Sequence, residues 1–120
     1  MHGYRDLVAW KQAMELVTEI YRVTRTFPKD ELYGLTSQLR RTAVSVPSNL
    51  AEGYSRNSPK ELHQFIGHAR GSLAEVETQI EIAQNLGYVN PAAAADLLSR
   101  IAELGRVLTG LRAWSAHAGA

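Results

Sequence analysis

The sequence predicts an all-α fold, an antiparallel up-down-up-down bundle of four helices in which the second helix is kinked at Pro47. Apolar residues recur every three or four positions in four stretches, which is the period of a helix buried along one side. Two helix-start signals, Ser58-Pro59 and Asn90-Pro91, divide the second half of the chain. Only short breaks separate the stretches, so consecutive helices are expected to pack in opposite directions.

Composition favours a single globular domain over residues 1–120, ordered from about 4 to 114 with a frayed C-terminal tail. The chain is 45% hydrophobic and 21% charged, as ordinary folded domains are. It contains no cysteine, which excludes disulfides, thiolate metal sites and cysteine nucleophiles. Neither a signal core nor an apolar run of membrane-spanning length is present, so we expect a soluble, cytoplasmic protein that makes no membrane contact.

The first helix is expected over residues 5–26, with a broad apolar stripe. Its central seam is expected to comprise Leu7, Trp10, Met14, Val17 and Tyr21, flanked by Ala13, Leu16, Ile20 and Val23. Charged and polar residues hold the opposite face, which is typical of a bundle helix. Phe27-Pro28 is expected to end it, because the residue before a proline is driven out of the helical region.

The second helix is expected over residues 30–55, with Asp30 as its N-cap. Its apolar stripe comprises Leu32, Leu35, Leu39, Ala43, Val46, Leu50 and Tyr54. Pro47 lies within this pattern; it lacks a backbone donor and its ring presses on the carbonyl of Ala43, which predicts the kink.

The third helix is expected over residues 59–86, capped by Ser58 at its start and by Gly87 at its end. The fourth is expected to begin after Asn90 and to fade between Gly110 and Trp114, leaving residues 115–120 as the tail. Their apolar stripes comprise Leu62, Phe65, Ile66, Ala69, Leu73, Val76, Ile80, Ala83 and Leu86, and then Leu97, Ile101, Leu104, Leu108 and Leu111.

The sequence lacks the residue spacing of the common metal and catalytic sites. Di-iron bundles need Glu-x-x-His on their helices, whereas Lys60 and Phe65 stand three residues before His63 and His68. Because no strand is predicted, no Gly-rich phosphate loop can follow one. We therefore expect a protein that is not an enzyme and that needs no metal or cofactor.

A row of small residues, Gly67, Gly71 and Ala74, lies on one face of the third predicted helix. Each glycine costs about 1 kcal/mol relative to alanine inside a helix, so two of them suggest that another backbone passes close by. Close packing within the bundle and a contact between subunits both explain the row.

Polar residues of the second predicted helix form a stripe around Pro47: Arg41, Ser45, Ser48, Asn49, Glu52 and Arg56, with Arg40 beside it. One interpretation is a network that satisfies backbone groups freed by the proline. The other is a recognition surface for a phosphate backbone or a partner's carboxylate. The chain carries a net charge of only +1, but residues 1–60 hold nine Lys and Arg against six Asp and Glu.

Several groups of residues, in this order and spacing, carry a resemblance to a known family: Asp6-Leu7, Trp10-Lys11, Ala13, Tyr21, Phe27-Pro28, Glu31, Gly34-Leu35, residues 38–41, residues 43–53, Glu61, residues 69–75 and Leu86-Gly87-Tyr88. The chain resembles the four-helix-bundle proteins encoded in intervening sequences of bacterial 23S ribosomal RNA genes. A related group comprises the accessory proteins of diversity-generating retroelements, which bind a reverse transcriptase and nucleic acid through a basic surface.

This resemblance implies a ring-shaped homopentamer of antiparallel four-helix bundles with no known enzymatic activity. The leading hypothesis is a non-enzymatic, homo-oligomeric accessory or scaffold that binds RNA or DNA. The residues expected to contact phosphates are Arg40, Arg41, Arg56, Lys60 and Arg70. The alternative is a protein–protein adaptor ring with a protein partner and no nucleic-acid role.

Overall fold

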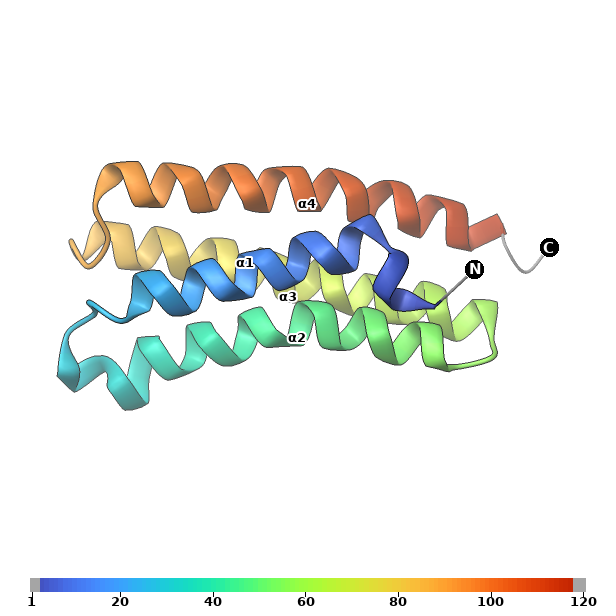
Figure 1. The fold of residues 1–120 in the computed structure, drawn as a ribbon, viewed down its shortest axis with the longest axis horizontal. Helices are drawn as coiled ribbons and strands as arrows, with labels where there is room; N and C mark the ends of the chain where they lie inside the picture. The colour runs from blue at the N-terminus through green and yellow to red at the C-terminus, as the bar shows by residue number, and fades with distance from the viewer. Residues whose placement is uncertain (1–2, 118–120) are drawn as a thin grey trace.

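The computed structural model describes residues 3–117, which form four long α-helices joined by short turns (Figure 1). The helices are α1 (Val8–Thr24), α2 (Ser37–Ser55), α3 (Pro59–Asn85) and α4 (Pro91–His117). Two 3-10 turns, Tyr4–Asp6 and Lys29–Glu31, and a π-helical turn, Leu32–Thr36, complete the helical structure. Residues 3–117 contain no β-strand. The predicted all-α fold with four helices is therefore confirmed.

The chain reverses direction at each link, so that neighbouring helices run antiparallel (Figure 1). α1 packs against α2 and α4, and α3 packs against the same two helices from the opposite side. The resulting bundle measures 48 × 24 × 21 Å. The α1–α2 and α3–α4 links lie at one end of the bundle and the α2–α3 link lies at the other.

The core is a set of apolar stripes, one from each helix, that meet along the bundle axis. Its largest fully buried side chains are Leu16, Ile20, Leu39, Val46, Leu50, Ile66, Val76, Ile80, Leu97, Leu104 and Leu108. Burying an aliphatic side chain of this size stabilises the fold by about 1.5–3 kcal/mol before opposing entropy is counted. Most of the apolar stripes predicted for α2, α3 and α4 are thus found in the core.

The buried face of α1 differs from the predicted one. The structure buries the row that contains Ala13, Leu16 and Ile20, whereas Met14 and Tyr21 of the expected central seam stay 42% and 41% exposed. Tyr21 lies at the edge of the helix, where the guanidinium of Arg40 sits 4.7 Å from its ring centroid. The helix also begins at Val8 rather than at residue 5, because the preceding residues form a 3-10 turn.

The start of the second helix also differs from the expectation. The predicted N-cap, Asp30, lies in a 3-10 turn, and the π-helical turn after it contains Gly34 in a non-helical conformation (φ −114°, ψ −115°). The carboxylate of Glu31, rather than that of Asp30, accepts a 3.1 Å hydrogen bond from the Leu35 N–H. α2 then continues through the buried Pro47 without a break in its helical assignment, and the kink there stays a prediction.

The predicted caps of α3 and α4 are confirmed by hydrogen bonds. Ser58 Oγ accepts from the Glu61 N–H at 3.2 Å, and Asn90 Oδ1 accepts from the Ala93 N–H at 2.8 Å. Gly87 ends α3 with φ +78°, a left-handed conformation that glycine adopts without the steric cost of a Cβ.

α4 is longer than predicted, since it continues past Gly110 to His117. Ser115, expected to belong to a frayed tail, is 3% exposed and donates a 2.7 Å hydrogen bond to the Arg112 carbonyl. Nδ1 of His63 on α3 lies 2.9 Å from the Ser115 hydroxyl oxygen and ties the two helices together. The remainder of the expected tail, residues 118–120, lies outside the described residues.

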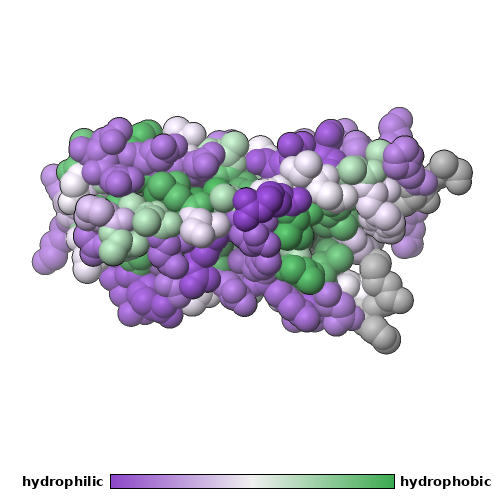
Figure 2. All heavy atoms as spheres, turned by 90° about the horizontal axis from the view of Figure 1, so that it is seen from above, coloured by the Kyte–Doolittle hydropathy of each residue, from purple (hydrophilic) through white to green (hydrophobic). Residues whose placement is uncertain are grey.

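The surface is polar with scattered apolar areas. Seen from above, apolar side chains reach the surface in separate areas that polar side chains divide (Figure 2). None of the helices within residues 3–117 has both the length and the apolar character needed to cross a membrane.

Candidate nucleic-acid interface

The five predicted phosphate contacts do not form one patch. Arg40 and Arg41 lie in the first turns of α2, whereas Arg56 directly follows its last residue. Sixteen residues of helix, at about 1.5 Å each, separate Arg40 from Arg56 by about 24 Å. Lys60 lies in the first turn of α3 and Arg70 lies farther along that helix. Their individual surroundings therefore decide which of them can face a phosphate.

Arg56 is held by two carboxylates. It donates to Glu52 at 3.1 Å and to Glu61 at 3.3 Å, and its guanidinium lies 5.3 Å from the ring centroid of Phe65. The hydrogen bond to Glu52, with the charges of both carboxylates, raises the pKa of Arg56 above its already high value. This arginine joins the end of α2 to the start of α3, and its charge is already balanced.

Arg40 is anchored without a carboxylate. Its Nε donates to the Thr24 hydroxyl at 2.8 Å and its Nη2 donates to the Tyr21 carbonyl at 3.4 Å. Both partners lie in the last turn of α1, where the helix dipole favours a cation. Within residues 3–117, no carboxylate lies within ion-pair distance of Arg40.

Arg41, Lys60 and Arg70 are exposed cations. Arg41 donates to the Ser37 hydroxyl at 2.8 Å. None of the three forms an ion pair with a carboxylate of the described part of the chain. In contrast to Arg56, these side chains keep an uncompensated charge that a phosphate can approach.

The α1–α2 link gathers further cations around Arg40. Arg25 and Lys29 line a pocket of about 340 Å³ together with Arg40 and two threonines, Thr24 and Thr36. We call Arg25, Lys29 and Arg40 the basic corner. None of them is paired with a carboxylate among residues 3–117.

The two acidic residues of the same link, Asp30 and Glu31, form no ion pair with this group. Glu31 accepts hydrogen bonds from the Leu35 N–H and, at 2.9 Å, from the hydroxyl of Tyr88 in the α3–α4 link. Asp30 is exposed, and its charge also acts on Tyr88. Neither carboxylate forms an ion pair with the basic corner, although both are close to it in sequence.

Arg25 and Lys29 were not among the predicted contacts, because no single-helix pattern connects them with Arg40. The signal in the sequence that could have identified them was the predicted topology of the helices. A short link between antiparallel helices brings the end of the first helix close to the start of the second. Cations that flank such a link become neighbours in space.

The polar stripe around Pro47 is used within α2. Ser45 Oγ donates to the Thr42 carbonyl at 2.6 Å, and Asn49 Nδ2 donates to the Ser45 carbonyl at 2.7 Å. Glu52 holds Arg56, whereas Ser48 is exposed. Neither carbonyl is that of Ala43, which Pro47 leaves without its helical donor, so the network around the proline and the recognition surface both stay predictions.

The small residues of α3 have unequal surroundings. A Cβ on Gly67 would meet Arg112 Nε at 3.2 Å, whereas one on Gly71 would meet nothing within 4 Å. Ala74 is exposed. Among the glycines of the four helices, Gly53 of α2 has the tightest surroundings, since a Cβ there would lie 2.8 Å from the Cβ of Phe65 on α3. A subunit contact at Gly71 and Ala74 stays a prediction.

Among residues 3–117, no three His, Asp or Glu side chains lie close enough together to hold a metal ion. Glu75, Glu77 and Glu81 of α3 are exposed.

Comparison with known proteins places this bundle in a family. The sequence profile of the family described as 23S rRNA-intervening sequence protein matches residues 5–110, which covers α1, α2 and α3 and most of α4. No curated protein matches the chain. With the profile covering most of its length, the chain belongs to the 23S rRNA-intervening sequence protein family.

Proposed function

We propose that this protein is a non-enzymatic, homo-oligomeric accessory or scaffold that binds RNA or DNA through the phosphate backbone. The observation that carries this proposal is the basic corner of Arg25, Lys29 and Arg40, with the exposed Arg41 next in sequence. None of these four cations has a carboxylate partner within the described residues.

The arginines among these cations suit a phosphate. Arginine presents several donors in a planar fork and keeps its charge at every physiological pH. Hydrogen bonds between such a group and an anion are about twice as strong as neutral ones. The net charge of the whole chain, +1, offers little long-range attraction, so contact at the corner has to supply the affinity.

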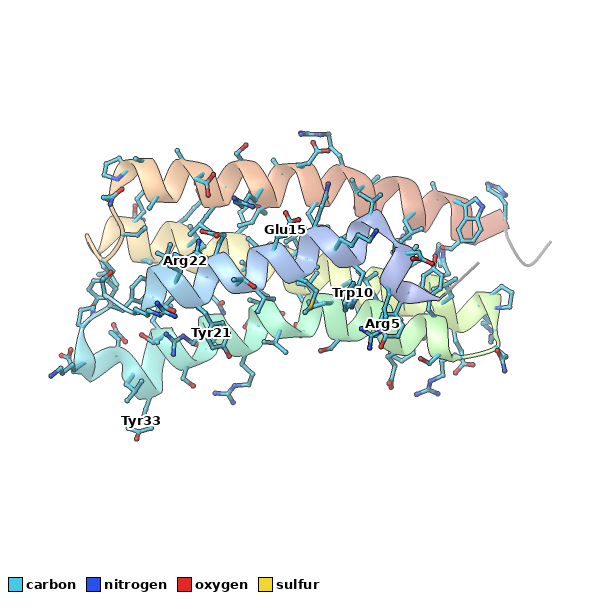
Figure 3. The ribbon with its side chains drawn as sticks, viewed as in Figure 1. Arg5, Trp10, Glu15, Tyr21, Arg22 and Tyr33 are labelled. Carbon is cyan, nitrogen blue, oxygen red and sulfur yellow. The ribbon has the colours of Figure 1, made fainter. Side chains whose placement is uncertain are left out.

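Assembly multiplies this contact. In the homopentamer that we propose, each copy contributes one basic corner, and several weak contacts on one strand add up to avid binding. Two features support assembly: Gly71 faces open space on α3, and Tyr33 is 94% exposed. Tyr33 points away from the bundle near the α1–α2 link (Figure 3). Exposed aromatic side chains are typical of protein interfaces.

Fluorescence anisotropy with a labelled structured RNA and a labelled DNA duplex tests the proposal. The affinity is expected to fall steeply as salt rises from about 50 to 200 mM, because phosphate contacts release counterions. The Arg40→Ala/Arg41→Ala double variant is expected to bind more weakly, whereas Arg106→Ala, which removes an arginine already paired with Glu103, serves as the control. Absence of binding to either nucleic acid at low salt would overturn the proposal.

The second candidate function is a protein–protein adaptor ring. The observation that favours it is the exposed apolar surface beside Tyr33, where Leu32 is 48% exposed. A partner that stays bound after nuclease treatment and is lost in Tyr33→Ser would support this function. Light scattering tests assembly for both functions, and a monomer mass at high concentration would contradict the ring.

A further inference from the structure

The pocket at the basic corner contains a buried hydroxyl group that has no partner. Thr36 lines this pocket and is 4% exposed, yet its Oγ1 makes no hydrogen bond to any described residue. Thr36 precedes the first residue of α2, a position where threonine often caps a helix, but its side chain makes no capping bond. Buried hydroxyl groups in folded proteins are normally paired, so an unpaired one on a residue that lines a pocket calls for a partner that the chain itself does not supply.

The charges that line the pocket favour an anion as its ligand. Arg25, Lys29 and Arg40 line the same pocket, and no acidic side chain does. Arg40 uses Nε and Nη2 for its bonds to α1, so its guanidinium is held in place. Its Nη1 donates to no described residue and stays available. A fixed guanidinium loses little freedom when an anion binds.

Size and shape add to this chemistry. The pocket has a volume of about 340 Å³, larger than a simple ion needs, and Phe27, Pro28 and Leu32 form its apolar wall. Such a space accommodates a phosphate together with part of the sugar or base attached to it. Ligand sites of this kind combine apolar walls with a few polar groups that fix orientation.

We infer that this pocket binds the terminal phosphate of a nucleic-acid strand, with the Thr36 hydroxyl donating to a phosphate oxygen and the basic corner neutralising its charge. A terminal phosphate monoester carries more negative charge than an internal diester and offers three free oxygens. The inference rests on the proposed function, because it names the part of the nucleic acid that the corner recognises.

The inference is tested by measuring the binding of two single-stranded RNA oligonucleotides of the same sequence, each labelled with a fluorophore at its 3′ end. One strand carries a 5′-phosphate and the other a 5′-hydroxyl. The phosphorylated strand is expected to bind about tenfold more tightly, because the pocket forms charge-assisted hydrogen bonds with its terminal phosphate. Thr36→Val and Lys29→Gln are expected to bring the two affinities within about twofold of each other. Lys11→Gln, which removes an exposed lysine near the start of α1, is expected to leave the ratio unchanged.

Thr36→Val keeps the shape of the side chain and removes only the hydroxyl. Replacing an unpaired buried hydroxyl by a methyl group is expected to leave the unfolding temperature the same or higher. A loss of phosphate preference without a loss of stability therefore supports a ligand-binding role. A large drop in stability would show that the hydroxyl is structural and would overturn the inference.

Equal binding of both wild-type complexes would overturn the phosphate pocket and leave the proposed function standing. Binding of neither strand at low salt would overturn the phosphate pocket, and the proposed function falls with it only if structured RNA and duplex DNA also fail to bind. Titration with inorganic phosphate and with a mononucleotide, followed by calorimetry, forms the third arm. If these small molecules bind and the oligonucleotides do not, the pocket takes free phosphate compounds, which overturns the assignment to a strand end.

Discussion

The hydroxyl of Tyr88 donates a 2.9 Å hydrogen bond to the carboxylate of Glu31. This bond joins the α3–α4 link to the α1–α2 link, and the same carboxylate accepts from the Leu35 N–H. Beside it, the ring of Tyr88 packs on Phe27 with 5.6 Å between centroids. At this end of the bundle, the two links are thus joined by the Tyr88–Glu31 hydrogen bond and by the packing of the Tyr88 ring on Phe27.

This contact predicts a loss of stability at alkaline pH. The hydrogen bond to Glu31, together with desolvation and the nearby carboxylate charges, raises the pKa of Tyr88 above its usual 10.0. The folded state then holds the proton more tightly than the unfolded chain, so this stability is present below pH 10 and is lost as pH rises through the folded pKa. We expect Tyr88→Phe to be less stable than wild type at about pH 8 and to lose less stability above about pH 10.

Chemical denaturation across this pH range measures the effect. Tyr33→Phe is the matched control, since that tyrosine is almost fully exposed. If Tyr88→Phe and wild type lose stability with the same pH dependence, the bond to Glu31 does not contribute as described.

Gly34→Ala is expected to destabilise the α1–α2 link. A Cβ at this position would lie 2.6 Å from Oε1 of Glu31 and would displace the carboxylate from both of its hydrogen bonds. Losses of this kind cost about 1–3 kcal/mol. Gly110→Ala, where a Cβ meets nothing within 4 Å, is the control and is expected to stabilise α4 by up to about 1 kcal/mol. Thermal unfolding of both variants compares them, and equal shifts would contradict the role assigned to Gly34.

Gly53→Ala and Gly71→Ala are expected to have opposite effects on the subunit. At Gly53 the added Cβ would lie 2.8 Å from the Cβ of Phe65, so α2 and α3 must separate at a cost of about 1–3 kcal/mol. At Gly71 the space is open, and the higher helix propensity of alanine is expected to add about 1 kcal/mol. Denaturation of both variants tests this difference.

Gly71→Ala also tests the proposed assembly when its mass is measured by light scattering. A more stable subunit that no longer assembles would place Gly71 in a subunit contact. A more stable subunit with unchanged assembly would remove this position from the interface.

Ser115→Ala is expected to loosen the end of α4. The substitution removes the hydroxyl that bonds to the Arg112 carbonyl and to His63 on α3. A buried hydrogen bond of this kind contributes about 1 kcal/mol. Hydrogen exchange of the last turns of α4 is expected to speed up by several-fold, with little change in α1. Exchange that rises equally throughout the bundle would indicate a global rather than a local effect.

Arg41 lies on α2 and Arg56 directly follows its last residue. We nevertheless expect the two arginines to contribute differently to nucleic-acid binding. Arg41→Ala removes an unpaired cation and is expected to lower the salt dependence of binding by about one unit of slope. Arg56→Ala is expected to change it little, because Glu52 and Glu61 already balance this charge. Equal losses in the two variants would show that ion pairing in the free protein does not decide which arginines bind.

The sequence predicted the bundle because its main signals are local. The ends of α3 and the start of α4 are marked by capping residues, Ser58, Gly87 and Asn90. Each of them forms a hydrogen bond to a residue no more than four positions away. Apolar periodicity likewise identified the buried stripes of α2, α3 and α4. It misplaced the centre of the α1 stripe because Met14 and Tyr21 keep the helical period while lying at the edge of the packed face.

The features that sequence reasoning missed depend on contacts between distant residues. The bond between Ser115 and His63 joins positions 52 apart, so nothing local marks the last turns of α4 as ordered. The basic corner likewise needs the chain reversal between α1 and α2 to bring Arg25 and Lys29 to Arg40. Of the two partners of Arg56, Glu52 precedes it by one helical turn, a spacing visible in the sequence, whereas Glu61 lies beyond the α2–α3 link.

The alternating direction of the helices has a practical consequence for measurement. Val8 at the start of α1 and His117 at the end of α4 lie at the same end of the bundle, and the basic corner lies at the opposite end (Figure 1). An affinity tag or a surface attachment joined to either end of the chain therefore leaves the corner facing the solution. Biosensor binding experiments with the immobilised protein can thus report on the corner without blocking it.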